Sequence, residues 1–224
     1  MTNVLEENLT DLFSSIRLSS YKYDDNDTNS IILDRYLYNI ELSKSLYPLL
    51  SILEISLRNR INKALDTVIM SDWLLKEAAQ QNVLLANEHK KLIEAKQKLI
   101  NKGHKNFSKD DLTAELSLGF WIHLCTKRYK TALWHKQGFF RIVFADYPNF
   151  AEFDKLSRIF PLLQLMLKIR NRVFHHEIII NHSYGIENCY NDLRKLLGYI
   201  SKDSLIYLDK ICDFKEVIKK QKPQ

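Results

Sequence analysis

Hydrophobic positions recur every three to four residues along most of the chain, which is the spacing of amphipathic helices. This pattern predicts helices over residues 4–17, 31–70, 73 onward, 83–102, 149–174, 186–200 and 203–220. No stretch sustains the two-residue alternation of a half-buried strand, although residues 177–180 are compatible with a short extended piece. The pattern therefore predicts an all-α fold, a helical bundle with additional inserted helices, in a single domain over residues 1–224.

Short polar motifs and prolines predict where these helices begin, bend and end. Asp72 is placed to cap the helix that begins at Trp73, and Gly103 to end the helix over 83–102. Residues 108–111 resemble a capping box that opens the next helical region. Pro48 predicts a kink or break in the long segment over 31–70, and Pro161 a bend in the segment over 149–174.

Composition narrows the functional classes. With 46% hydrophobic residues, 5 glycines and 4 prolines, the chain can bury a core and is typical of long helices. A net charge of +6 favours a polyanionic partner. Three widely spaced cysteines indicate neither a disulfide framework nor a zinc module. No signal peptide or apolar run of about 18 residues is present, so we expect a cytoplasmic protein without a membrane segment.

The stretch KIRNRVFHHEIII, residues 168–180, holds the strongest chemical candidates. On a helix, Asn171 and His175 share one face, and Arg170 and Arg172 flank it. Arginine offers a fork of donors to a phosphate, and histidine exchanges a proton near neutral pH. This set suits attack on a phosphodiester, but the spacing alone is equally typical of a solvated helix end.

Other basic residues offer secondary candidates with alternatives beside them. Arg58 and Asn59 either support a phosphate site, or Arg58 pairs with Glu54 one turn before it. A second basic group lies among aromatic residues that we assign to the core; it either binds nucleic acid or forms a solvated face, and comprises Lys127, Arg128 and Lys130.

Metal binding is not expected near the two adjacent histidines. His176, Glu177 and His182 lie within seven residues, but His175 and His176 cannot both face one ion from a regular helix. We interpret His176 as a secondary RNA contact or a helix cap. The chain also lacks the phosphate-binding, dinucleotide, zinc-protease and hydrolase motifs, so no cofactor is predicted.

Four short motifs follow one another along the chain. The first is YLYNIELSKSLYPLLSILEISLRNRINKAL at 36–65, with a tyrosine-x-x-asparagine helix leading into Leu-Glu-x-x-Leu-Arg-Asn. LSLGFWIHL at 116–124 holds a Gly-x-Trp element, TALW follows at 131–134, and the residues from Arg170 to His175 form an RNxxxH motif. In their order and spacing these motifs resemble the Abi-like (abortive infection) branch of the HEPN superfamily. The similarity covers most of the chain, in motifs that are individually short.

This resemblance implies a HEPN-type helical bundle that acts as a metal-independent endoribonuclease in phage defence or as a toxin. Two copies would meet as a homodimer to form a composite site, with Arg170 and His175 catalytic and Asn171 positioning. RNA would be the substrate, and an antitoxin protein or a regulatory RNA a further partner. Arg172, His176, Arg58 and Asn59 would support the site. The alternatives are a non-catalytic RNA-binding protein and a protein-interaction module that senses a phage component.

Overall fold

The computed structural model describes residues 12–104, 106–151 and 154–220. All regular secondary structure within these ranges is helical, which confirms the predicted all-α class. None of the helices in this described part is long and apolar enough to cross a bilayer.

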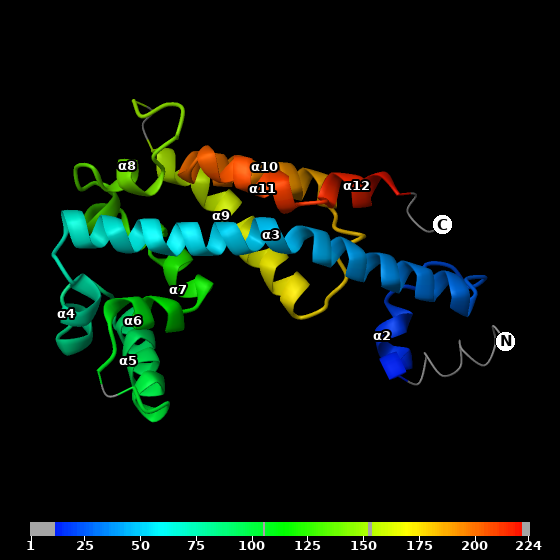
Figure 1. Cartoon of the computed structure of the whole chain (residues 1–224), viewed down its shortest axis with the longest axis horizontal. Helices are drawn as coiled ribbons and strands as arrows, with labels where there is room; N and C mark the ends of the chain where they lie inside the picture. Colours follow the sequence, from blue (N-terminus) through cyan, green and yellow to red (C-terminus); the bar gives the residue numbers. More distant parts are fainter. Residues whose placement is uncertain (1–11, 105, 152–153, 221–224) are drawn as a thin grey trace.

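One long helix, α3, forms the axis on which the other elements pack (Figure 1). It runs over Asn29–Val68, and α2 (Ser15–Ser19) packs near its start. At its other end lies a group of short helices: α4 (Trp73–Ala79), α5 (Ala86–Asn101), α6 (Lys109–Glu115) and α7 (Leu118–His123). The short turns η1 (Lys127–Tyr129) and η2 (Lys130–Trp134) then lead to α8 (Phe139–Val143).

The C-terminal third of the chain packs back along α3. Helix α9 (Lys155–Phe174) begins near α8 and crosses α3 in Figure 1. The chain then returns along α3 as α10 (Ile186–Ile200), α11 (Asp203–Ile211) and α12 (Phe214–Lys219). Consequently the end of α9 lies beside the first half of α3, although more than 100 residues separate them in sequence.

Helix α3 runs through Pro48 without a break. The predicted break at this proline is therefore wrong. A proline inside a helix removes one hydrogen bond at a cost of about 3 kcal/mol. The turns on either side of Pro48 bury one face of the helix, with Leu46, Leu49, Leu50 and Leu53 each 0% exposed. Burying each leucine contributes about 1.5–3 kcal/mol, which outweighs the cost of the proline.

Two of the predicted helix boundaries are confirmed in atomic detail. Ser108 and Asp111 form the reciprocal bonds of a capping box at the start of α6. Gly103 has φ 87 and donates to Ile100, while His104 donates to Leu99; this is the Schellman arrangement that ends α5.

Helix α4 begins at Trp73 as predicted, but three other details differ from the predictions. Asp72 precedes α4 without making a side-chain capping bond, and Asp66 of α3 accepts the amide of Trp73. Helix α9 starts at Lys155 rather than residue 149, with Pro161 inside it. The helix expected over 203–220 is two helices, because the chain extends at Cys212.

The helix expected over 4–17 falls partly on residues 1–11, which lie outside the described residues. Its remainder is interrupted at Ser14, which has φ 60 and caps α2 through its hydroxyl.

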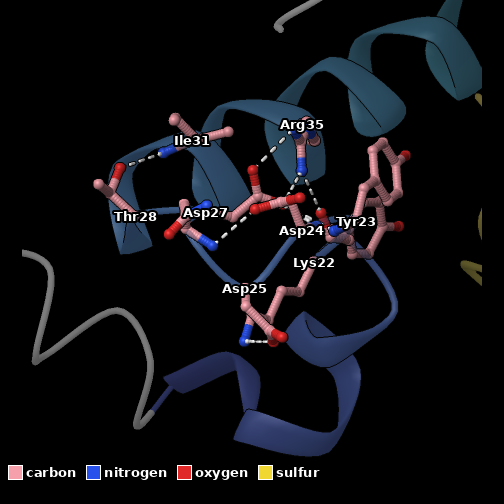
Figure 2. Close-up of polar contacts among 10 residues, drawn as sticks. Lys22, Tyr23, Asp24, Asp25, Asp27, Thr28, Ile31 and Arg35 are labelled. Atoms are coloured by element: carbon pink, nitrogen blue, oxygen red, sulfur yellow. Dashed lines mark hydrogen bonds and ion pairs between the residues drawn. The ribbon is translucent and has the colours of Figure 1, made fainter.

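The loop between α2 and α3 is organised around one buried cation, Arg35 (Figure 2). Its guanidinium donates to both carboxylate oxygens of Asp27, at 2.5 and 3.0 Å, and to the carbonyl of Tyr21 at 2.9 Å. It also stacks on the ring of Tyr23, 4.1 Å from the centroid. The hydrogen bond from Arg35 holds the pKa of Asp27 well below its usual range. This arrangement fixes α2 against the start of α3.

Aromatic residues around α7 and η2 belong to the core, as predicted. Trp121 and Leu124 are 0% exposed, and Trp134 is 7% exposed with its indole N–H bonded to the carbonyl of Leu124 at 2.7 Å. The ring of Trp121 is therefore unavailable for stacking on an extended RNA strand.

Candidate nucleic-acid site at the end of helix α9

The sequence motif lies in the last turns of α9 and in the segment that follows it. The α-helix ends at Phe174, so His175 occupies the C-cap position and His176 the next position, with φ 57. His176 donates to Val173 at 3.3 Å, and Glu177 donates to Arg172 at 2.8 Å, as in a Schellman turn. Glycine usually occupies the left-handed position, and a histidine there costs about 1 kcal/mol. We call residues 175–180 the cap segment.

Helix α2 holds the cap segment from one side. Arg17 Nη1 donates to the carbonyl oxygen of His176 at 2.7 Å, across 159 residues of sequence. A strained backbone persists where its surroundings impose it, and it is found most often at functional sites. The bond from Arg17 is one such constraint, because it fixes the peptide that follows the left-handed residue.

Helix α3 holds the same segment from another side, through the buried side chain of Asn39. Its Oδ1 accepts the amides of Ile179 at 2.8 Å and Ile180 at 3.3 Å, and its Nδ2 donates to the carbonyl of Glu177 at 3.3 Å. Residues 177–179 thus have no regular secondary structure, and one asparagine side chain binds the backbone groups of this segment. The bonds of Asn39 span 138 to 141 residues of sequence.

Arg170 is held at the surface by one acid and one aromatic ring. Its Nε donates to Glu54 Oε2 of α3 at 3.1 Å, and the guanidinium lies 4.5 Å above the ring of Phe174. Phe174 in turn contacts Tyr47, with centroids 5.8 Å apart. The predicted pair between Glu54 and Arg58 is absent from the described residues, because Glu54 binds Arg170 instead.

Arg170, Asn171 and His175 are close in sequence, but no hydrogen bond joins their side chains within the described residues. The amide of His175 donates to the carbonyl of Asn171 at 2.8 Å, which places the two residues one turn apart as predicted. Asn171 is half-buried, and the imidazole of His175 is exposed. Within the described ranges, no side-chain hydrogen bond engages His175, so its imidazole is available to a ligand.

Positive charge surrounds the cap segment. Arg17, Arg172 and His176 line a cavity of about 490 Å³ between α2 and the end of α9, together with one acid, Glu177. Arg172 Nη1 also donates to the carbonyl of Ile178 at 3.2 Å. Burial, with the charges of Lys168 and Arg172, lowers the pKa of the neighbouring His182. Glu177 pairs with Arg172 at 3.8 Å, and Arg17 has no acidic partner among the described residues, so this cavity favours an anion.

Arg58 and Asn59 face a different part of the surface. They line a cavity of about 610 Å³ between α3 and α6, and none of the residues lining it belongs to α9. The Nε of Arg58 is buried without a hydrogen-bond partner in the described part of the chain. The hypothesis that both residues assist the motif therefore has no contact to support it.

The second basic group lies at the opposite end of α9. Lys127 and Arg128 are exposed on η1, and Lys130 forms an ion pair with Asp154 at 3.0 Å, just before α9 begins. The twenty residues of α9 separate this end from the motif by about 28 Å, at 1.5 Å per residue.

The adjacent histidines do not form a metal centre with His182. His176 faces the cavity beside α2, whereas His182 is buried with its Nδ1 3.5 Å from the sulfur of Cys189. No group of three or more His, Cys, Asp or Glu side chains suited to a metal lies within residues 12–104, 106–151 and 154–220.

Three residues at this site escaped sequence reasoning: Arg17, Asn39 as a clamp, and Glu54 as the partner of Arg170. Their contacts join distant segments, and no local signal marks them. Compared with known proteins, the chain matches no family model, and no curated protein or solved structure matches it significantly. Interpretation of the site therefore depends on its own geometry: an exposed imidazole, two arginines and a strained turn held in place by two other helices.

Proposed function

We propose that this protein is a metal-independent endoribonuclease of the HEPN type, acting in the cytoplasm in phage defence or as a toxin. The observation that carries the proposal is the exposed imidazole of His175, at the end of a helix whose last turns present Arg170, Asn171 and Arg172. The strained cap segment beside it is fixed by Arg17 and Asn39, as expected where a reactive group must keep its position.

The proposed reaction uses the ribose 2′-hydroxyl as the nucleophile. His175 takes the proton from the 2′-oxygen, which attacks the phosphorus as the bond to the 5′-oxygen breaks. The leaving 5′-oxygen takes a proton from a general acid, so the products are a 2′,3′-cyclic phosphate and a 5′-hydroxyl. Arg170 stabilises the charge on the phosphoryl oxygens through its Nη atoms, since its Nε is bound to Glu54.

This reaction needs an acid as well as a base, and we propose that a homodimer supplies both. Exposed apolar side chains gather beside the motif: Ile40 is 46%, Tyr47 53%, Phe174 41% and Ile211 62% exposed. These four residues, which we call the apolar patch, line one shallow cavity together with His176. An apolar surface of this kind is typical of a protein interface. A second copy packed there brings a second His175 towards the first.

Cleavage without metal is tested directly with purified protein and a single-stranded RNA in excess chelator. We expect wild-type protein to leave 2′,3′-cyclic phosphate and 5′-hydroxyl ends, and His175→Ala or Arg170→Ala to lower the rate at least about 10³-fold. His104→Ala removes another exposed histidine, at the end of α5, and serves as the matched control that retains activity.

Two other outcomes separate the rival functions. Salt-dependent RNA binding without cleavage identifies a non-catalytic RNA-binding protein, a reading favoured by the engagement of Arg170 with Glu54 and Phe174. Cellular toxicity that survives His175→Ala but not a charge in the apolar patch identifies a protein-interaction module. Co-purification of an antitoxin protein or a regulatory RNA would identify the partner that restrains the enzyme.

A further inference from the structure

A second pocket lies at the start of α9, at the end of that helix remote from the motif. It has a volume of about 650 Å³ and lies between η2, α8 and the first residues of α9. We call it the distal pocket. Its lining includes Lys130, Lys136, Arg141, Phe150, Asp154 and Lys155. Small-molecule sites in proteins have volumes of about 300–1,000 Å³, so the pocket is large enough for one ligand.

Irregular backbone shapes this pocket. Its wall includes η2, a π-helical turn of a kind found frequently at functional sites. Gly138 adopts φ 84 and Asp154 adopts φ 58, and both line the cavity. The buried rings of Trp134 and Phe140, 7% and 8% exposed, pack beneath these turns and form an apolar floor.

The rim of the distal pocket is cationic. Four cations, Lys130, Lys136, Arg141 and Lys155, line it against a single described carboxylate, Asp154. Lys130 pairs with that carboxylate at 3.0 Å, and this hydrogen bond is the main cause of the lowered pKa of Asp154. Lys130 therefore matches the charge of Asp154, and neither Lys136 nor Arg141 forms an ion pair with an acid among the described residues.

The half-buried residue Phe150 contacts one cation through its ring and another through its backbone carbonyl. The guanidinium of Arg141 lies 4.6 Å above the centroid of Phe150, and Lys155 Nζ donates to the carbonyl of the same residue at 2.9 Å. Arg141 and Lys136 are both exposed, so their charged groups reach solvent and any ligand that enters.

We propose that the distal pocket binds a nucleoside phosphate, with the base against the aromatic floor and Phe150, and the phosphate at Lys136 and Arg141. An inorganic anion makes no use of the rings, and a purely apolar ligand leaves the cations desolvated without a partner. A ligand with one flat aromatic part and one anionic part matches both features. A free nucleotide and one nucleotide of an RNA strand share this chemistry. The proposal does not depend on RNA cleavage.

Calorimetric titration with AMP and UMP, against adenosine and inorganic phosphate, tests this chemistry. We expect the nucleotides to bind at least about tenfold more tightly than either part alone. Lys136→Ala and Arg141→Ala should each weaken AMP binding about tenfold or more, whereas Lys98→Ala, an exposed lysine on α5, should leave it unchanged. Phe150→Leu should lower the affinity for AMP towards the affinity for inorganic phosphate. Melting curves confirm that each variant is folded.

Competition identifies the source of the nucleotide. If AMP displaces labelled single-stranded RNA from the inactive His175→Ala protein, the pocket holds part of the RNA strand; if both bind together, it holds a free nucleotide. The proposal is overturned if AMP shows no binding at about 10 mM, or if Lys136→Ala and Arg141→Ala both bind AMP like wild type. Failure of RNA cleavage by the wild-type protein would refute the proposed function alone, because AMP binding is measured without RNA.

Discussion

His176 combines an exposed imidazole with a backbone conformation that favours glycine. Its φ of 57 places the next peptide where Arg17 and Asn39 bind, so the turn itself is required whatever side chain is present. A histidine at this position therefore lowers the stability of the fold relative to glycine, and it places an imidazole at the surface of the site. The consequence is that stability and RNA affinity should respond in opposite directions to one substitution.

We predict that His176→Gly raises the free energy of unfolding by about 0.5–1 kcal/mol, because glycine adopts positive φ without strain. The melting temperature should rise by about 2 °C, and RNA affinity should fall. His176→Ala removes the same imidazole but keeps the strain, so it should lower affinity without the gain in stability. An equal rise in unfolding free energy for both variants would show that backbone strain at His176 is not the cause of the change in stability.

Asn39 is a second residue that holds the cap segment in one backbone conformation. It satisfies two backbone N–H groups and one carbonyl of the cap segment. We predict that Asn39→Ala lowers the free energy of unfolding by about 2–4 kcal/mol, because it leaves buried amides without acceptors. RNA cleavage should fall as well, although Asn39 does not contact the substrate.

Chemical denaturation of Asn39→Ala and of Asn59→Ala measures this effect with a matched control. Asn59 is exposed on the same helix, so its removal should change stability by less than about 0.5 kcal/mol. Asn39→Asp keeps the acceptor and loses the donor, and it should lie between the two. A destabilisation of Asn39→Ala no greater than that of Asn59→Ala would contradict the clamp.

At the scale of elements, the α2–α3 loop determines whether Arg17 can reach the cap segment. Arg35 binds Asp27 and the carbonyl of Tyr21, and thereby fixes α2 beside the first turns of α3 (Figure 2). The pKa of Asp27 is depressed in the folded protein. Its charge therefore contributes stability that is complete above the unfolded pKa of about 3.9 and is lost as the pH falls further.

We predict that wild type and Asp27→Asn differ most in unfolding free energy near pH 7, and that the difference shrinks below about pH 4. Protonated Asp27 cannot accept both bonds from Arg35, so acid removes what the substitution removes. Urea titrations of both proteins from pH 7 to pH 3 measure this difference in unfolding free energy. The contributions of the other carboxyl groups cancel, because both proteins contain them. A difference that stays constant over this range would refute the linkage.

The elements themselves were largely predictable from sequence, and their mutual contacts were not. Periodicity placed the helices because one face of each is buried, and local chemistry placed the caps at Ser108 and Gly103. The motif was recognisable because its members are neighbours in sequence. The bonds from Arg17, Asn39 and Glu54 join residues more than 100 positions apart, so no local pattern encodes them. Continuous helix through Pro48 was missed for the same reason, since its cause is tertiary burial.

At the scale of the whole molecule, the proposed site is incomplete in one chain. The apolar patch flanks the motif on α3, α9 and α11, and its residues would be buried in a dimer. Helix α9 would then connect the two proposed functional regions, the composite site at its C-terminal end and the distal pocket at its start.

We predict that the wild-type protein is a dimer in analytical ultracentrifugation, and that Ile211→Asp weakens dimerisation at least tenfold, or by about 1.4 kcal/mol. A charge in an apolar interface is desolvated without a partner. RNA cleavage should fall together with dimerisation. Ile93→Asp, an equal change on exposed α5, should preserve both. A wild-type monomer at tens of micromolar, or a dimer insensitive to both Ile211→Asp and Tyr47→Asp, would refute this interface.

The clamp from Asn39 also has a consequence for protein synthesis. The cap segment takes its shape only when residues 177–180 have left the ribosome and returned to a helix made about 140 residues earlier. A nascent or prematurely terminated chain that lacks this segment contains the whole of α3 but no formed site. If the protein is the proposed nuclease, its activity against the RNA of its own cell, and even against the messenger being translated, would therefore arise only after residues 177–180 have been made and bound by Asn39.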